Sequence, residues 1–360
     1  MLDAGTLRGM VFGDCSIALN DLPSWHGVSC FSGTYREGLE AFQVFEDLGY
    51  MPDGTGTHTW VLIEKRGIST DQAAERLAAC AAVAQKDVGY AGKKDTVAVV
   101  RQWMSVLTKS MLSVGTIDKC CSIVSVTRNS RKLKVGQLAG NRFRLRLSGQ
   151  ASDIFEVRMA CIADQGFPNY FGLQRFGRKG QNLDAAKRLA VRDPRGKRRL
   201  HPKDAMAASA ARSAGFNAIV AERIVRGALL DAGVDDAVIL TGRGSHFQIR
   251  ADELASVTTR IGVGELSPTA PLMGSCSKTG ERQAEIESRV LEQDPLLYRW
   301  LSGIFREEER RSVRVVPKEL EWSRSGTTLE LSFWLPRGSF ATAFLHEIGQ
   351  LTESNERTIA

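Results

Sequence analysis

Residues Gly89–Gln102 read GYAGKKDTVAVVRQ, a glycine-bearing turn followed by an apolar segment. The turn places the carboxylate of Asp95 beside Lys93 and Lys94, directly before residues that favour a β-strand. Two interpretations are open. Such turns are commonly solvated surface on which the charges contribute little to stability. Alternatively, the turn holds a carboxylate in a cleft next to a cation, an arrangement found at catalytic sites.

The segments on both sides of this turn predict a mixture of strands and helices. The sequence S-T-D-Q from Ser69 is a capping box with Gln72, and it predicts the start of a helix. Alternating or short apolar runs predict strands at 42–46, 60–63, 121–126, 141–147 and 328–335, and further helices are predicted at 153–163, 204–232 and 340–351. We therefore expect an α+β fold with several antiparallel strands.

The composition and charge limit the functional classes to which the protein can belong. The formal net charge of +7 favours polyanionic partners, although many enzymes that bind no nucleic acid are equally basic. The seven cysteines include no C-x-x-C pair, and the five histidines form no H-E-x-x-H motif, so we expect no zinc site and no disulfide framework. No run of about 18 apolar residues predicts a membrane span, and acids among the first 21 residues argue against a secretory signal. We expect a cytoplasmic protein with reduced thiols.

Positive charge is concentrated in two segments. In NRFRLRL (141–147) the arginines alternate with apolar residues, so a strand here has one apolar and one cationic face. The segment RDPRGKRRLHPK (192–203) predicts a basic loop and a domain boundary. The arginine face of the strand is either a solvated surface or a phosphate-binding stripe, and the basic loop is expected to add phosphate contacts. The second interpretation assigns phosphate contacts to Arg142, Arg144, Arg146, Arg195, Lys197, Arg198 and Arg199.

Two further clusters combine aromatic residues with glycines. PNYFGLQRFGR (168–178) is either a tight core turn or a platform on which a base stacks while an amide or guanidinium reads its edge. FWLPRGSFAT (333–342) is typical of a strand end that leads into a helix.

Taken in order, these segments resemble the TruD family of pseudouridine synthases. The resemblance runs from FQVFEDLGYMPDGTGTH through YAGKKDTVAVVRQW, RKLKVGQLAGNRF and NYFGLQRFGRKGQN to FWLPRGSFAT, roughly residues 40 to 350. It implies a pseudouridine synthase catalytic fold, a mixed, largely antiparallel sheet with flanking helices, that carries an inserted α/β TRUD domain. The implied boundaries are 1–190 and 312–360 for the catalytic domain and 191–311 for the insertion.

The resemblance also implies roles for individual residues. Asp95 matches the catalytic aspartate, while Asn169, Phe171 and Phe340 match residues of the active site. The family usually has a lysine before the first strand, where this chain has Arg36, and an aspartate where it has Ala41. We expect Arg36 or Lys94 to pair with the Asp95 carboxylate, and Phe171 to stack on the extruded uridine.

The implied reaction is the isomerisation of a uridine, uridine 13 in the D-arm of tRNA. It breaks and remakes bonds within one molecule, so we expect no cofactor and no metal, with tRNA as partner and a monomeric protein. Two alternatives remain open. One is a catalytically silent RNA-binding or RNA-chaperone protein on the same fold. The other is an aspartate-nucleophile hydrolase. Such an enzyme would be expected to have metal-binding carboxylates, and the sequence shows no motif for them.

Overall fold

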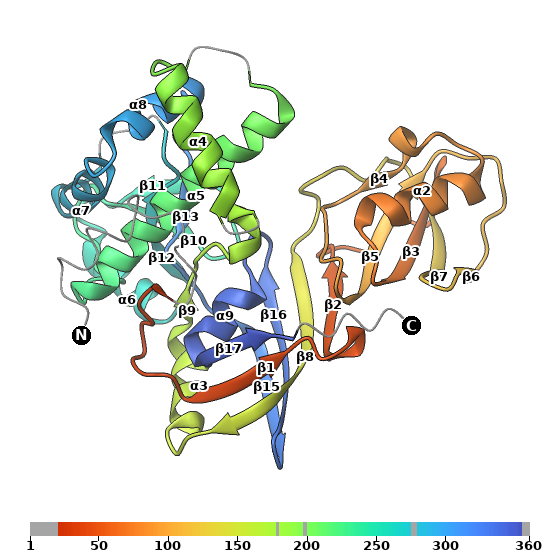
Figure 1. Ribbon diagram of the computed structural model, residues 1–360, viewed down its shortest axis with the longest axis horizontal. Helices are drawn as coiled ribbons and strands as arrows, with labels where there is room; N and C mark the ends of the chain where they lie inside the picture. The colour runs from red at the N-terminus through yellow and green to blue at the C-terminus, as the bar shows by residue number, and fades with distance from the viewer. Residues whose placement is uncertain (1–20, 178–179, 197–199, 275–278, 355–360) are drawn as a thin grey trace. The chain divides into compact units, whose positions relative to one another are not determined.

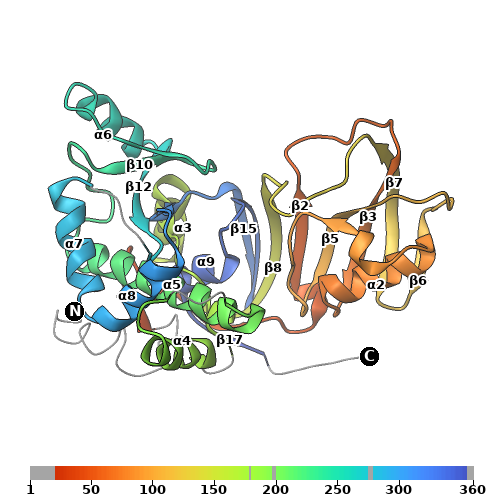
Figure 2. The same cartoon turned by 90° about the horizontal axis from the view of Figure 1, so that it is seen from above.

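The computed structural model describes residues 21–177, 180–196, 200–274 and 279–354. The chain folds into two compact units, each built from separate stretches of sequence (Figures 1 and 2). Of the described residues, the sheet unit comprises those within 31–152, 317–338 and 351–354, and the helix-rich unit comprises those within 21–30, 153–316 and 339–350. The predicted α+β class is confirmed. The domain boundaries that the resemblance implies differ from these units and remain a prediction.

In the described part of the chain, eleven strands form one mixed sheet. Strands β2 and β5 pair in parallel, whereas β8 pairs antiparallel with β1, β2 and β16. The strands are β1 (Phe31–Tyr35), β2 (Phe42–Asp47), β3 (His58–Arg66), β4 (Gly89–Tyr90), β5 (Val99–Val106), β6 (Gly115–Asp118), β7 (Cys121–Asn129), β8 (Gly140–Ala151), β15 (Lys318–Ser325), β16 (Thr328–Pro336) and β17 (Gly349–Glu353).

Helix α2 (Thr70–Ala81) covers one face of this sheet near β3 and β5 (Figure 1). The predicted capping box is confirmed: the Ser69 hydroxyl accepts from the backbone N–H of Gln72, and the Gln72 side chain accepts from the N–H of Ser69. Leu77 and its neighbours on the same stripe are buried against Val61 and Met104. The helix therefore forms because local capping and an apolar face agree.

Strand β8 has the two faces that its alternation predicts. Phe143, Leu145 and Leu147 are buried, whereas Arg144 and Arg146 are exposed. Phe143 stacks on Phe333 of β16 at a centroid distance of 5.5 Å, which joins the neighbouring strands through their apolar face.

The helix-rich unit contains a four-stranded sheet in the order β11-β10-β12-β13, with helices around it (Figure 2). Its helices are α3 (Phe155–Gln165), α4 (Gln181–Arg192), α5 (Pro202–Val225), α6 (Leu254–Gly262), α7 (Glu281–Leu291), α8 (Pro295–Ile304) and α9 (Ala341–Ile348). Its strands are β9 (Phe167–Pro168), β10 (Ala237–Leu240), β11 (His246–Gln248), β12 (Leu266–Pro271), β13 (Arg310–Ser312) and β14 (Arg314–Val315).

Two predicted helices are shorter than expected. The helix predicted at 204–232 ends at Val225, shortly before Gly227, whose φ of 65° is left-handed. The helix predicted at 340–351 ends at Ile348, because Gly349 begins strand β17.

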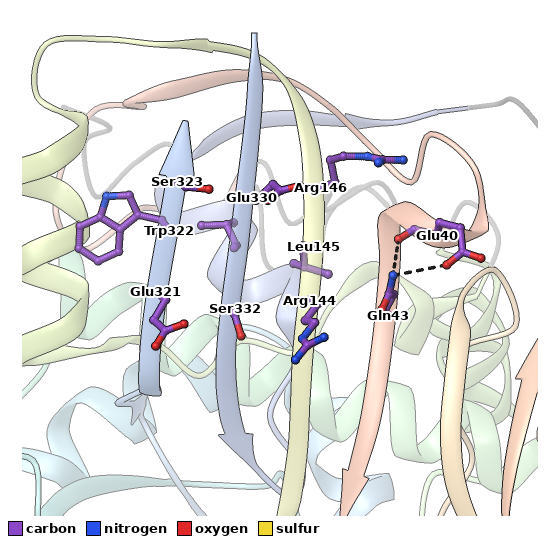
Figure 3. Close-up of a pocket in the computed structure, with 11 residues that line it drawn as sticks. Glu40, Gln43, Arg144, Leu145, Arg146, Glu321, Trp322, Ser323, Glu330 and Ser332 are labelled. Atoms are coloured by element: carbon purple, nitrogen blue, oxygen red, sulfur yellow. Dashed lines mark hydrogen bonds between the residues drawn. The ribbon is translucent and has the colours of Figure 1, made fainter. Parts of the chain in front are cut away.

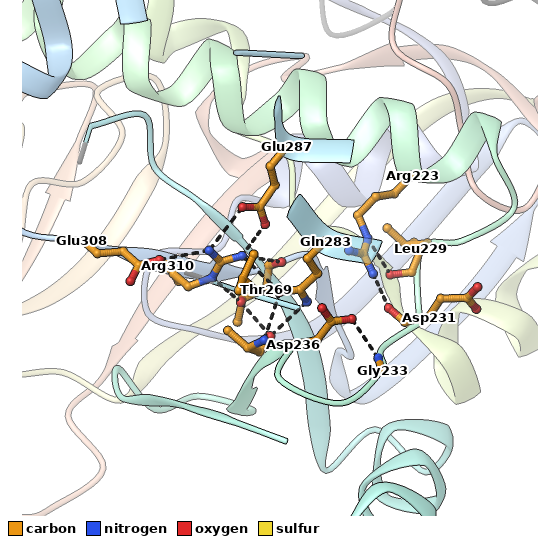
Figure 4. Close-up of polar contacts among 12 residues, drawn as sticks. Arg223, Leu229, Asp231, Gly233, Asp236, Thr269, Gln283, Glu287, Glu308 and Arg310 are labelled. Carbon is orange, nitrogen blue, oxygen red and sulfur yellow. Dashed lines mark hydrogen bonds and ion pairs between the residues drawn. The ribbon is translucent and has the colours of Figure 1, made fainter. Parts of the chain in front are cut away.

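A buried polar cluster joins the last strand of the smaller sheet to its helices (Figure 4). Arg310 of β13 pairs with Glu287 of α7 and with Glu308, and it also contacts Thr269 of β12. The side chains of Arg310 and Glu287 are 1% and 6% exposed. Because a buried ion without its partner is strongly unfavourable, this cluster fixes the arrangement of α7 against the sheet.

Candidate active site

The turn that carries Asp95 connects β4 to β5 and is held by buried polar groups. The backbone N–H of Lys94 donates to the Thr70 hydroxyl at 2.9 Å, and this hydroxyl donates to Gln102 at 3.0 Å. The Lys65 ammonium donates to the backbone carbonyl of Asp95 itself. Burial lowers the pKa of Lys65 to about 8, partly offset by Asp95. These contacts fix the backbone of Asp95, so its side chain projects from a rigid support.

Arg36 forms an ion pair with Asp95. Its Nη2 lies 3.2 Å from the Asp95 Oδ1, and its Nη1 lies 2.7 Å from the Glu353 Oε1 at the end of β17. The guanidinium lies over the ring of Phe42, 4.4 Å from the centroid. Arg36 is 3% exposed, while the Asp95 side chain is 26% exposed. A buried cation therefore holds a carboxylate that still reaches solvent.

The backbone of Arg36 is strained. Its φ of 64° lies in the left-handed region, which costs a non-glycine residue about 1–3 kcal/mol. The two ion pairs and the contact with Phe42 keep the residue there. Strain of this kind is concentrated at functional sites.

The two lysines next to Asp95 have other partners. The Lys94 ammonium lies 2.9 Å from the Glu46 Oε1 and donates to the Asn141 Oδ1 at 2.7 Å. Lys93 pairs with Asp71 at 2.7 Å. Of the two cations that the sequence suggests for Asp95, Arg36 contacts the carboxylate and Lys94 contacts Glu46 beneath the turn.

In the helix-rich unit, Phe171 and Phe340 form an aromatic cluster with Phe216 of α5. The ring centroids of Phe171 lie 5.7 Å from Phe340 and 5.6 Å from Phe216. The guanidinium of Arg311 lies 4.3 Å from the centroid of Phe171. Phe171 is 6% exposed, whereas Phe340 is half-buried. Phe340 is therefore the more accessible of the two predicted aromatic residues.

Asn169 holds Arg311. Its amide donates to the carbonyl of Ser312 at 2.9 Å, and its Oδ1 accepts from the Arg311 guanidinium. Burial, together with the smaller effect of the nearby Arg175, lowers the pKa of Arg311 to about 9. Because both ends of the Asn169 amide are engaged, it positions the guanidinium above the aromatic cluster.

The family-model comparison matches tRNA pseudouridine synthase D (TruD) over residues 26–196 and 198–348. The tRNA pseudouridine synthase D of Pectobacterium atrosepticum is 39% identical over 330 residues, which cover 90% of this chain and 94% of the relative. The chain belongs to the TruD family of tRNA pseudouridine synthases.

A second relative and one solved structure are also similar to this chain. The tRNA pseudouridine synthase D of Proteus mirabilis is 39% identical over 345 residues, 92% of this chain and 96% of the relative. The crystal structure of a putative tRNA pseudouridine synthase D from Methanosarcina mazei has a TM-score of 0.68 at 21% identity and covers 92% of this chain and 96% of that one. This similarity confirms the predicted pseudouridine synthase fold. TruD enzymes are isomerases.

The predicted phosphate-binding arginines of β8 lie on the opposite sheet face from the Asp95–Arg36 pair. The Arg36 guanidinium lies over the ring of Phe42, which pairs in register with Leu145, and Asn141 contacts Lys94 of the Asp95 turn. Side chains alternate along a strand, so Arg144 and its even-numbered neighbours point the other way.

Acidic residues surround these arginines (Figure 3). Arg142 pairs with Glu319. Arg144 and Arg146 line a pocket of about 550 Å³ that also contains Glu40, Glu321 and Glu330. The strand pattern predicts a cationic face, but Glu321 of β15 and Glu330 of β16 place carboxylates among its arginines. The phosphate contacts of these arginines remain a prediction.

The basic segment at 192–203 joins α4 to α5 inside the helix-rich unit. Arg195 is exposed in this loop. The predicted phosphate contacts Lys197, Arg198 and Arg199 lie outside the described residues.

Several site residues were missed by sequence reasoning. Glu46, Lys65, Glu353 and Arg311 have ordinary sequence surroundings, and their roles come from contacts between distant segments. Asn217 of α5 is a similar case: its amide binds both the backbone N–H of Phe171, at 2.8 Å, and its carbonyl, at 3.0 Å. Its position within ARSAGFNAIV, a segment also typical of the TruD family, is the one available signal.

Across the described residues, no group of three or more His, Cys, Asp or Glu side chains is arranged to hold a metal ion. None of the described helices is long and apolar enough to cross a membrane.

Proposed function

We propose that this chain converts uridine 13 of the tRNA D-arm into pseudouridine, with Asp95 as the catalytic residue. The observation that carries the proposal is the Asp95 carboxylate, which is partly exposed on a rigid turn and paired with the buried Arg36. Membership of the TruD family supports the reaction, and the match of Asp95 to the family's catalytic aspartate supports the assignment.

The reaction requires that the N1–C1′ bond breaks, that the uracil turns, and that C5 bonds to C1′. The hydrogen on C5 then leaves, and N1 carries a proton in the product. Atoms and redox state balance without a cofactor. The Asp95 carboxylate either attacks C1′ or assists formation of a glycal; attack at C6 is a third possibility. In each case Arg36 orients the carboxylate.

The uridine must leave its stack before reaction, which costs a few kcal/mol. We assign the extruded base to the aromatic cluster. Phe340 supplies the accessible ring, and Phe171 packs against it, with its backbone held by the Asn217 amide. Direct stacking by Phe171 is less favoured because Arg311 lies over its ring. Arg311, held by Asn169, is placed to bind a carbonyl oxygen of the uracil.

Release of tritium from tRNA transcribed with [5-³H]uridine tests the reaction, since isomerisation frees the C5 hydrogen. We expect release with the wild-type protein and with Asp87→Asn, in which an exposed carboxylate near the turn is changed. Asp95→Asn should release none. Release by Asp95→Asn at the wild-type rate would remove Asp95 from the chemistry. Binding of tRNA by the wild-type protein without any release would favour the silent RNA-binding protein.

A further inference from the structure

A second pocket of the sheet unit, which we call the lysine groove, has a different character from the pocket beside Arg144. It has a volume of about 550 Å³ and lies between α2, the short helix at Gln85–Asp87, β4 and the loop after β7. Its lining includes three lysines, Lys86, Lys132 and Lys134, together with Tyr90 and the exposed side chain of Val135.

The lysine groove is cationic. The one carboxylate that lines it, Asp71, is already bound by Lys93 at 2.7 Å and by the Tyr90 hydroxyl at 3.2 Å. Within the described ranges, Lys86 and Lys134 have no carboxylate partner, and both are exposed. In the other pocket, Arg144 and Arg146 share the lining with Glu40, Glu321 and Glu330, of which Glu40 is bound by Arg66. The lysine groove therefore has a more positive lining than the arginine face of β8, and positive charge attracts polyanions.

The frame of the lysine groove is rigid. A Cβ on Gly89 of β4 would lie 2.3 Å from the carbonyl oxygen of Leu133, so strand and loop approach as closely as only glycine allows. The Leu133 N–H donates to the Ser105 hydroxyl at 2.9 Å, and the Gly136 N–H donates to the Ala91 carbonyl at 2.7 Å. The lysine-bearing loop is thus held against β4, against Ser105 of β5 and against Ala91, which follows β4.

The lysine groove is also continuous with the catalytic turn. Strand β4 forms part of its lining and runs directly into Ala91–Asp95. Asp71, at the rim of the groove, accepts hydrogen bonds from both Tyr90 and Lys93 of this segment. A chain of phosphates lying in the lysine groove would therefore approach the Asp95 turn along β4.

We propose that the lysine groove binds the sugar–phosphate backbone of the RNA strand that carries the target uridine. Lys86, Lys132 and Lys134 contact phosphates, and Val135 contacts an apolar face of the nucleotides. This inference rests on the proposed function and adds to it the path of the substrate strand.

The test compares two double variants that each remove two exposed lysines of the sheet unit. K86Q/K134Q lies in the lysine groove, and K109Q/K119Q is the matched control outside it. Binding of an unmodified tRNA transcript is measured from 50 to 300 mM salt, and tritium release is measured at saturating RNA. For K86Q/K134Q we expect roughly tenfold weaker binding and a salt slope shallower by about 1.4, with the rate at saturation unchanged.

The control should match the wild-type protein in binding and in salt slope. An unchanged slope in K86Q/K134Q, or an equal loss in K109Q/K119Q, would overturn the proposal. These outcomes are separate from failure of the proposed function, which shows itself as absence of tritium release by the wild-type protein.

Discussion

Replacing Arg36 by methionine tests how the site holds its carboxylate. Methionine fills similar apolar space over Phe42 but leaves Asp95 and Glu353 without their shared cation. At 3.2 Å and an effective dielectric constant of 20, the Asp95–Arg36 attraction is about 5 kcal/mol. The Asp95 side chain is 26% exposed, so solvent screens this attraction to roughly 2–3 kcal/mol.

If that attraction keeps Asp95 in its reactive orientation, Arg36→Met should lower the single-turnover rate at saturating tRNA by about 100-fold. Binding should change little. Arg36→Lys should stay within about tenfold of wild type, because TruD proteins usually have lysine here and an ammonium still reaches one carboxylate.

The assay is rapid-quench tritium release, with Arg324→Met as a control for the loss of an exposed arginine of the sheet unit. Thermal unfolding checks that each variant folds. A folded Arg36→Met with a rate within threefold of wild type would refute the positioning role.

Further predictions concern the helix-rich unit. Burial raises the pKa of Glu347 to about 7 and lowers that of His346 to about 4. Because of Glu347, the free energy of unfolding should fall as the pH rises from 4.5 to 7. Because of His346, it should rise as the pH increases from 4 to 6.5, so the two effects largely cancel. In Glu347→Gln only the effect of His346 remains, so the free energy of unfolding in urea should rise by up to about 3 kcal/mol from pH 4 to 6.5. A pH profile as flat as that of the wild type would contradict this. Arg310→Met should destabilise by about 3–5 kcal/mol, because it leaves Glu287 buried without its partner, and Arg310→Met/Glu287→Leu should recover most of this in the same assay. Asn217→Ala should raise the tRNA concentration for half-maximal rate and lower the single-turnover rate, since it frees the Phe171 backbone; unchanged values for both would exclude the clamp.

Local patterns account for the parts of the fold that were predicted. The capping box at Ser69 and the alternation of Phe143, Leu145 and Leu147 depend on neighbours within a few residues, so they can be read without the tertiary structure. The segment 238–310 mixes strand, loop and helix signals without clear repeats. Its strands are short and pair with distant partners, as β12 does with β10 and β13.

In the candidate site, too, only contiguous residues could be predicted from the sequence. The motif around Asp95 could be found because its residues are contiguous, but the pairing of Arg36 with both Asp95 and Glu353 spans most of the chain. For the arginines of β8, the local pattern was correct but their place in the sheet could not be predicted. Alternation predicts that they share a face, but only the pairing of β8 with β2 shows that this face is opposite Asp95.

Pseudouridine mapping by carbodiimide-dependent primer-extension stops on unmodified tRNA tests the assignments of Asp95 and of uridine 13 together. We expect a new stop at position 13 with the wild-type protein and none with Asp95→Asn. Stops with both proteins, or a wild-type stop at another position only, would contradict these assignments.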